Sequence, residues 1–284
     1  MAEAAEFHYR LQYRVGGLRP GSHPGTSLGA GNEFVSHVRL FDRPDPRRLD
    51  LRASLRNLGG DWLVRVYRQR AGIPVQVIAD VSSSMRFGAR RTKLDVAADF
   101  VESLGQSTFR LGDALGMRAF DSQERADLFM PALRARGMGS VLATLLRRCE
   151  TRPGSIDGLL EAAAPLAASR GLVFLVSDFH WPLDRLNEVL NLLGNAWLVP
   201  MIVWDPAETE PPSPGAVAAL TDAESGKRRT LWLGRKLLGQ WRESVARRQA
   251  ELDRAFMVRN IRPFYVRGAF DAKAMSQYFL EAAA

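Results

Sequence analysis

The chain has 284 residues, of which 46% are hydrophobic and 25% are charged, a composition typical of globular proteins. Its single cysteine, Cys149, excludes an internal disulfide and a cysteine pair for a metal, so we expect a reducing compartment, the cytoplasm. The acidic amino terminus has no apolar signal core, and the best apolar stretch, residues 198–204, is far shorter than a membrane span. We therefore expect a soluble protein without membrane insertion.

The net charge of +8 is unevenly distributed along the chain. Residues 1–70 carry 12 Lys/Arg against 7 Asp/Glu, residues 71–225 carry 14 against 19, and residues 226–262 carry 11 against 3. Basic regions on both sides of an acidic middle fit docking onto an acidic partner, and they fit a solvated arginine-rich surface equally well. Because no recognition helix and no basic strand interleaved with aromatic residues accompanies the charge, nucleic-acid binding is the weaker alternative.

Residues 1–70 predict a β-rich N-terminal appendage. Apolar and polar side chains alternate from Phe7 to Val15, the period of a half-buried strand, and we expect an antiparallel strand there. The Gly- and Pro-rich segment that follows, to about residue 34, predicts a long loop. A β pattern returns over residues 35–41 and 62–67.

From residue 71 to residue 284 the pattern predicts an α/β domain. Apolar strand-like runs alternate with helical patterns, which is typical of a doubly wound, mostly parallel sheet covered by helices on both faces. The helical spacing of Leu94, Ala97, Val101 and Leu104 marks the first of these helices. We expect buried strands over residues 75–79, 114–120, 172–176 and 197–204.

A C-terminal extension is expected from about residue 215. Two mixed apolar runs on either side of the sequence ESGK predict a hairpin within residues 217–233, and an amphipathic helix follows over residues 235–257. Residues 263–266 and a final helix from Asp271 close the predicted fold.

Acidic and hydroxyl side chains follow two of the predicted strands. Asp80, Ser82 and Ser84 come directly after the first buried strand, and Asp178 ends the strand that begins at Leu172. If those two strands are neighbours, their carboxyl ends converge on one crevice, where open α/β folds place ligands. One carboxylate with alternate hydroxyls is a hard-oxygen, charge-poor set, which suits Mg²⁺ or Mn²⁺ with a position left open.

Two interpretations of this cluster remain. In the first, Asp178 holds a coordinated water and leaves the ion under-neutralised, so that an acidic side chain of a partner completes the site. In the second, Ser82 and Ser84 cap the following turn and Asp80 caps the helix, with no metal involved. The second acid at a strand end favours the metal.

At these residues the sequence resembles the von Willebrand factor A superfamily, whose metal-ion-dependent adhesion site has DxSxS after the first strand and an acid after the fourth. The segment GAGNEFVSHVRLFDRPDPRRLDLRASLRN, then VRVYRQRAGIPVQVIADVSSSM, and SDF later in the chain are similar to the bacterial DUF58 family. That family is often associated with MoxR-type AAA+ ATPases, and this chain is most similar to the variant linked to methanol dehydrogenase gene clusters. The resemblance covers nearly the whole chain.

The resemblance implies a von Willebrand factor A-like fold and an accessory role without enzymatic activity. The chain would act as a metal-dependent docking module with a MoxR-type ATPase in maturing or activating a client enzyme complex. The ATPase lies on another chain, because no GxxxxGK[ST] is present here. The superfamily's second-loop threonine has no clear counterpart, and ARGMGSVLATLL offers Ser140 as the ligand, with Thr144 as the alternative. Without either, the metal binds weakly or only with the partner.

Two enzymatic readings are weaker. A phosphoryl-transfer enzyme using Asp80 needs a second acid two positions on, where this chain has Ser82. The sequence Gly25-Thr26-Ser27-Leu28-Gly29 matches G-x-S-x-G, but it lies in a Gly/Pro-rich segment without the strand before and the helix after that the motif requires. The four histidines show no zinc-binding spacing.

Overall fold

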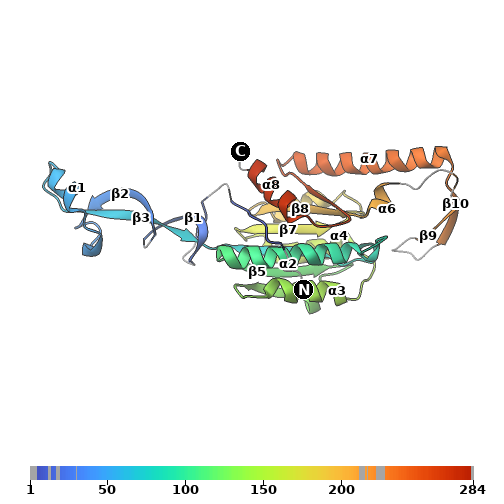
Figure 1. The fold of residues 1–284 in the computed structure, drawn as a ribbon, viewed down its shortest axis with the longest axis horizontal. Helices are drawn as coiled ribbons and strands as arrows, with labels where there is room; N and C mark the ends of the chain where they lie inside the picture. Colours follow the sequence, from blue (N-terminus) through green and yellow to red (C-terminus); the bar gives the residue numbers. More distant parts are fainter. Residues whose placement is uncertain are drawn as a thin grey trace. The chain divides into compact units, whose positions relative to one another are not determined.

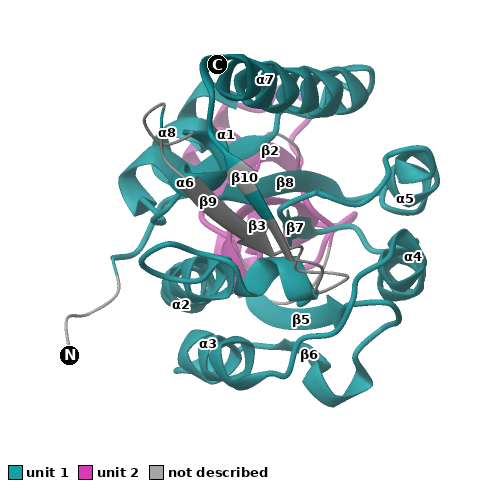
Figure 2. Cartoon of the chain, turned by 90° about the vertical axis from the view of Figure 1, so that its right-hand side faces the viewer, with its two compact units in different colours: residues 1–9, 74–110, 114–284 teal, residues 10–73, 111–113 magenta. Residues whose placement is uncertain are grey.

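The structure is a computed structural model, and it describes residues 5–11, 14–16, 20–29, 31–210, 215, 217–221 and 228–282. The chain forms two compact units, which are coloured separately in Figure 2. The α/β unit comprises residues 1–9, 74–110 and 114–284, and the β unit comprises residues 10–73 and 111–113. One boundary was predicted, at residue 70, whereas the first nine residues belong to the α/β unit.

A mostly parallel sheet of six strands forms the centre of the α/β unit (Figure 1). Neighbouring strands lie in the order β11-β8-β7-β4-β5-β6, and all pairs are parallel except β5 with β6. The mixed α/β class predicted from the sequence is confirmed. The strands are β4 Pro74–Asp80, β5 Ala114–Phe120, β6 Met130–Leu133, β7 Leu172–Ser177, β8 Trp197–Trp204 and β11 Phe264–Arg267.

Strand β6 was not predicted from the sequence. It has four residues, contains Pro131 and lies at the edge of the sheet, antiparallel to β5. An edge strand pairs with a neighbour on one side only and therefore tolerates proline. A strand of four residues that includes proline does not show the alternation by which strands are predicted.

Helices cover both faces of the sheet. In Figure 2, α2 and α3 lie on one side and α4 and α5 on the other. Successive residues of β7 point to opposite faces: Leu175 belongs to the cluster formed with α4, α5 and α7, while Phe174 meets the ring of Phe100 on α2. The α-helices of this unit are α2 Lys93–Leu111, α3 Met138–Arg148, α4 Ile156–Ala163, α5 Leu186–Leu192, α6 Pro206–Thr209, α7 Arg235–Met257 and α8 Ala272–Ala282, and the 3₁₀ helices are η2 Ser83–Arg86, η3 Ala126–Leu128 and η4 Ala164–Leu166. None of the described helices has both the length and the apolar character needed to cross a membrane.

The antiparallel strand predicted over residues 7–15 is wrong for the part of it that the structure describes. Only Val15 has a strand partner, an isolated bridge to Gly25. The backbone N–H of Phe7 donates instead to the Ser107 hydroxyl of α2 (3.0 Å), and that of His8 donates to the Ser276 hydroxyl of α8 (3.0 Å). An extended chain that buries alternate side chains between two helices has the same period as a strand, so the alternation could not separate them.

The β unit contains a three-stranded antiparallel sheet in the order β1-β3-β2. The loop predicted for the Gly- and Pro-rich segment is wrong, because the segment contains strand β1. A Cβ atom on Gly25 would lie 2.2 Å from the carbonyl oxygen of Gln69, so glycine is needed for β1 to approach β3 this closely. Ser27 lies on this strand, and no helix follows it, so the G-x-S-x-G context is absent. The elements are β1 Pro20–Gly29, β2 Glu33–Arg39, η1 Pro46–Arg48, α1 Leu51–Arg56 and β3 Leu63–Ala71.

The predicted C-terminal extension is confirmed in its main elements. Strands β9 Val217–Thr221 and β10 Arg228–Trp232 pair antiparallel, and α7 follows over the predicted residues. The ESGK sequence at residues 224–227 lies outside the described residues. The last helix, α8, begins after Asp271, whose side chain accepts from the N–H of Lys273 (2.8 Å).

The position of Phe7 allows a test of the fold. Its side chain is buried against Phe100, Phe174 and Phe279, so Phe7→Ala should lower the free energy of unfolding by about 3 to 5 kcal/mol in urea denaturation followed by circular dichroism. Leu280→Ala is the control, because Leu280 is exposed and its loss should cost less than about 0.5 kcal/mol. Equal effects from the two variants would contradict this placement of residues 5–9.

Candidate functional site

The carboxyl ends of β4 and β7 bring four of the five predicted site residues, Asp80, Ser82, Ser84 and Asp178, into one region. The two strands are parallel neighbours in the middle of the sheet, with Ala79 paired to Val176. Asp80 therefore ends one strand beside Ser177, which ends the other. The condition on which the sequence prediction depended, that these strands are neighbours, is met.

Asp80 is buried, and both of its carboxylate oxygens accept hydrogen bonds. Oδ1 accepts from the backbone N–H of Ser82 (2.9 Å), and Oδ2 accepts from the hydroxyl of Ser177 (2.6 Å). The hydroxyl oxygens of Ser82 and Ser84 lie 3.2 Å apart. Three of the five predicted residues thus form one cluster of oxygen atoms, and Ser177 is an additional member that the sequence analysis did not identify.

Asp178 is also buried here, but its carboxylate is engaged by a lysine. The Lys93 ammonium at the start of α2 lies 2.7 Å from Asp178 Oδ2 and 2.7 Å from Glu208 Oε1. The other oxygen, Oδ1, accepts from the N–H of His180 (3.1 Å). Lys93 is only 1% exposed, and neither it nor Glu208 was predicted as part of the site. Nothing in the sequence distinguishes Lys93 from an ordinary surface lysine on an amphipathic helix.

The two strand-end aspartates differ in their protonation behaviour. Burial raises the pKa of Asp80 to about 6, and the negative charge of Asp178 adds to the rise, against the lowering effect of the hydrogen bonds from Ser177 and Ser82. Burial also acts to raise the pKa of Asp178, but the Lys93 ammonium, the His180 side chain and a hydrogen bond from Ser84 together outweigh burial, so that pKa lies below its usual value. Burial lowers the pKa of Lys93, and the charges of Asp178 and Glu208 outweigh this and raise it.

Ser140 is not brought to the cluster. It lies exposed on α3 and donates to Glu102 Oε1 of α2 (3.2 Å), while Thr144, the alternative, donates to the carbonyl oxygen of Ser140 (2.8 Å). Glu102 is nine residues along α2 from Lys93, about 14 Å along the helix axis. The reason is topological. Strand β6 runs antiparallel to β5, so the chain leaves β6 at the opposite end of the strands from the carboxyl end of β4, and Ser140 follows there.

The segment beside the cluster is instead the loop between α3 and α4, residues 149–155. The N–H of Ser83 donates to the carbonyl oxygen of Arg152 (2.9 Å), and a Cβ atom on Gly154 would lie 2.5 Å from the Cβ atom of Ser82. This loop carries two hydroxyl residues, Thr151 and Ser155. The signal that could have found it is the sequence TRPGS at residues 151–155, a turn with two hydroxyl residues between α3 and α4.

The donor set fits a small hard cation. Asp80, Ser82 and Ser84 supply only oxygen atoms, the ligand type that Mg²⁺ and Mn²⁺ prefer. The described part of the chain holds no group of three or more His, Cys, Asp or Glu side chains arranged for a metal, so a site here depends on hydroxyls. Because Lys93 and the N–H of His180 occupy the oxygens of Asp178, that aspartate suits an outer position better than direct coordination.

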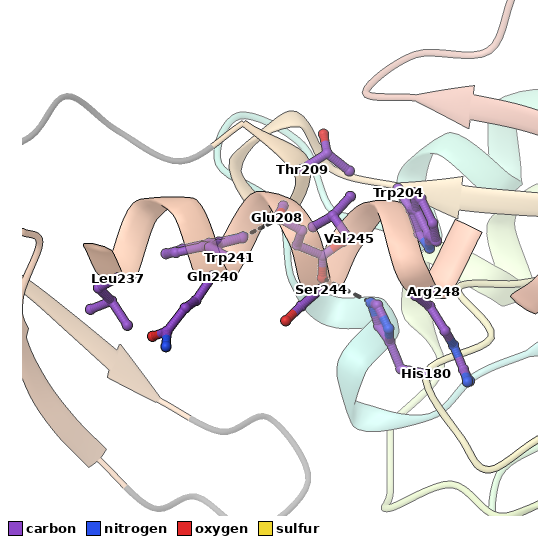
Figure 3. Close-up of a pocket in the computed structure, with 10 residues that line it drawn as sticks. All are labelled: His180, Trp204, Glu208, Thr209, Leu237, Gln240, Trp241, Ser244, Val245 and Arg248. Carbon is purple, nitrogen blue, oxygen red and sulfur yellow. Dashed lines mark hydrogen bonds and ion pairs between the residues drawn. The ribbon is translucent and has the colours of Figure 1, made fainter. Parts of the chain in front are cut away.

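A hollow of about 490 Å³ adjoins this network (Figure 3). Its walls include Trp204 at the end of β8 and Trp241 on α7, whose indole N–H donates to the carbonyl oxygen of Glu208 (2.7 Å). The imidazole of His180 lies 3.6 Å from the Glu208 carboxylate. Glu208 thus belongs both to the ion pair with Lys93 and to the wall of a pocket that two tryptophans also line.

Comparisons with known proteins identify relatives of this chain. The family described as protein of unknown function DUF58 matches residues 41–252. An uncharacterized protein of Mycobacterium tuberculosis (strain ATCC 25618 / H37Rv) is 25% identical over 253 residues, which are 86% of this chain and 77% of that protein. Similar solved structures include an aerotolerance-related membrane protein from Bacteroides fragilis NCTC 9343 (13% identity, TM-score 0.45, 74% of this chain and 98% of that one). Another is the conserved hypothetical protein BatB from Bacteroides thetaiotaomicron (15% identity, TM-score 0.44, 75% of this chain and 99% of that one).

Removal of Lys93 tests the ion network. Lys93→Met leaves two carboxylates without their shared counter-charge, one of them fully buried, and should lower the free energy of unfolding by about 3 to 5 kcal/mol in urea denaturation at neutral pH. The matched control is Arg91→Met, since Arg91 makes an exposed ion pair with Asp99 that should contribute less than about 1 kcal/mol. If Lys93→Met costs no more than the control, the network is not the structural centre of the site.

The raised pKa of Asp80 predicts a pH dependence of stability. With a pKa of about 6 in the folded chain against 3.8 unfolded, the unfolded state releases this proton first, so the free energy of unfolding falls as the pH rises through that window. The variant Asp80→Asn has no such proton to lose. The free energy of unfolding of this variant, relative to that of wild type, should therefore rise by about 2 to 3 kcal/mol as the pH goes from 4 to 7. Urea denaturation in EDTA at several pH values measures this, and parallel curves would contradict it.

Proposed function

This chain belongs to the DUF58 family, and on that premise we propose that it is a non-enzymatic, metal-dependent docking module whose α/β unit has the von Willebrand factor A-like fold. The observation that carries the proposal is the cluster that Asp80, Ser82 and Ser84 form with Ser177, where the carboxyl ends of the neighbouring parallel strands β4 and β7 meet. Mg²⁺ or Mn²⁺ held there supplies a Lewis acid to which a carboxylate of another protein binds.

The charge balance of the site supports binding to an acidic partner. Lys93 neutralises part of the negative charge of Asp178 and Glu208, so Asp80 is the carboxylate of the cluster with no ion pair among the described residues. At neutral pH Asp80 is largely ionised, because its pKa is about 6. One carboxylate and neutral hydroxyls leave a divalent ion with excess positive charge, which a partner's Asp or Glu side chain would balance.

The environment of Asp80 supports binding over phosphoryl transfer. An enzyme that uses a strand-end aspartate as the nucleophile in phosphoryl transfer also needs a general acid beside it. The position two residues on, where such enzymes place a general acid, is Ser82.

The partners we propose come from the family resemblance. A MoxR-type AAA+ ATPase is the first, and a client enzyme complex that it matures or activates in the cytoplasm is the second, with methanol dehydrogenase the first client to test. The basic segment 226–262, with 11 Lys/Arg against 3 Asp/Glu, supports an acidic partner surface.

Titration calorimetry of Mg²⁺ and Mn²⁺ into the full chain tests the metal site. Asp80→Ala should abolish the binding heat, and Ser84→Ala should weaken binding by about tenfold or more, since a hydroxyl ligand is lost. The matched control is Ser83→Ala, which removes a hydroxyl from the same loop between the two predicted ligands and should bind like wild type. Equal heats of metal binding for wild type and Asp80→Ala would show that Asp80 does not bind the metal.

Partner binding is tested by a pull-down of the ATPase with the full chain in Mg²⁺ and in EDTA. We expect retention in Mg²⁺ that is lost in EDTA and in Asp80→Ala but kept in Ser83→Ala. If the ATPase is retained equally in EDTA and by Asp80→Ala, the interface lies elsewhere on the chain.

A further inference from the structure

Helix α1 of the β unit has its apolar side chains on the outside. Leu51 and Leu55, one helical turn apart, are 56% and 83% exposed, whereas Ser54 is buried. The Ser54 hydroxyl donates to the carbonyl oxygen of Asp50 (2.7 Å) and accepts from the N–H of Leu63 (2.8 Å), so hydrogen bonds hold the polar side of α1 against β3. This is the reverse of the usual arrangement, in which the apolar stripe of a helix faces the protein.

Three more exposed apolar side chains lie in segments joined to this helix. Phe41 is 95% exposed, Leu58 is fully exposed and Trp62 is about half exposed. The N–H of Leu40 donates to the carbonyl oxygen of Trp62 (2.7 Å), and that of Asp50 donates to the carbonyl oxygen of Leu63 (2.8 Å). These bonds bring the end of β2, the start of α1 and the start of β3 together. We call the five side chains of this region the apolar tip: Phe41, Leu51, Leu55, Leu58 and Trp62.

The surroundings of the apolar tip are basic. Arg47, Arg52 and Arg56 are exposed, and none of the three forms an ion pair with an acidic residue of the described chain. Residues 10–73 and 111–113 carry 12 Lys/Arg against 6 Asp/Glu, a net charge of +6 for the β unit. Single exposed apolar residues are ordinary on protein surfaces, but five large ones in one short region, bordered by unpaired arginines, mark an interaction surface.

We propose that the apolar tip binds the surface of an anionic lipid bilayer. Phe41, Leu55 and Leu58 stand out nearly free of protein contact, and such side chains enter fluid acyl chains without needing a matching pocket. Trp62 is of the residue type favoured at the boundary between acyl chains and headgroups. The arginines on α1 lie beside the leucines, where their long side chains reach lipid phosphates. This surface holds the protein at a membrane and does not involve the Asp80 cluster.

Vesicle co-sedimentation of the full chain in EDTA tests the proposal. We expect binding to phosphatidylcholine vesicles that contain phosphatidylglycerol and much weaker binding to phosphatidylcholine alone. Arg52→Gln/Arg56→Gln should lower the apparent affinity roughly 30-fold, as two lost charges predict. Phe41→Ser/Leu55→Ser/Leu58→Ser should lower it at least about tenfold. All of these residues are exposed, and circular dichroism checks that each variant is folded.

The matched control is Met257→Ser/Leu280→Ser, which removes two exposed apolar side chains from the α/β unit and should bind like wild type. A blue shift of tryptophan emission on anionic vesicles, absent in Trp62→Phe, would place the contact at the tip. Equal binding to both kinds of vesicle, or unchanged binding by the triple variant, would overturn the proposal. So would self-association without vesicles that the triple variant abolishes, because the occupant would then be a second copy of this chain.

Discussion

The site depends on one buried cation, the ammonium group of Lys93 between the carboxylates of Asp178 and Glu208. It joins the start of α2, the end of β7 and the short helix α6, segments that are far apart in the sequence. A buried carboxylate without a partner is strongly destabilising, so each of the three elements is held in place by the charge of another. The same arrangement fixes the electrostatics of the neighbouring strand end, because it compensates Asp178 and leaves Asp80 as the carboxylate available to a metal.

The sequence predicted the α/β unit well, because the features that define it are local and periodic. Strand β8 was predicted over Trp197–Trp204 and α7 over Arg235–Met257, the bounds that the structure has. The convergence of Asp80 with Asp178 was also predictable, since parallel neighbours carry their carboxyl ends to one edge of a sheet. Where the backbone pattern was shared by two structures, the prediction failed: the alternation after Phe7 belongs to an extended segment between helices, and the glycines of β1 serve close strand pairing.

The rest of the site depends on contacts that no local pattern encodes. Lys93 and Glu208 are 115 residues apart and look like solvated charges in the sequence. Ser140 was the predicted counterpart of the superfamily's second-loop threonine. Strand β6 runs antiparallel to β5, so the chain that carries Ser140 leaves β6 away from the carboxyl end of β4, and the loop at residues 149–155 lies beside Ser82 instead. The outward-facing leucines of α1 were not predicted, because a six-residue helix is too short for its sequence to indicate which side faces the protein interior.

We propose that Asp80, Ser82 and Ser84 form a metal site while Lys93 stays paired with Asp178 and Glu208. Anomalous scattering from crystals of the full chain soaked in Mn²⁺ is the decisive test. We expect one anomalous peak within coordination distance of Asp80 and at least one of the two serine hydroxyls, with the Lys93 ammonium still bound to Asp178. No peak at Asp80, or a peak at Asp178 with Lys93 displaced, would show that the metal site is not the one proposed.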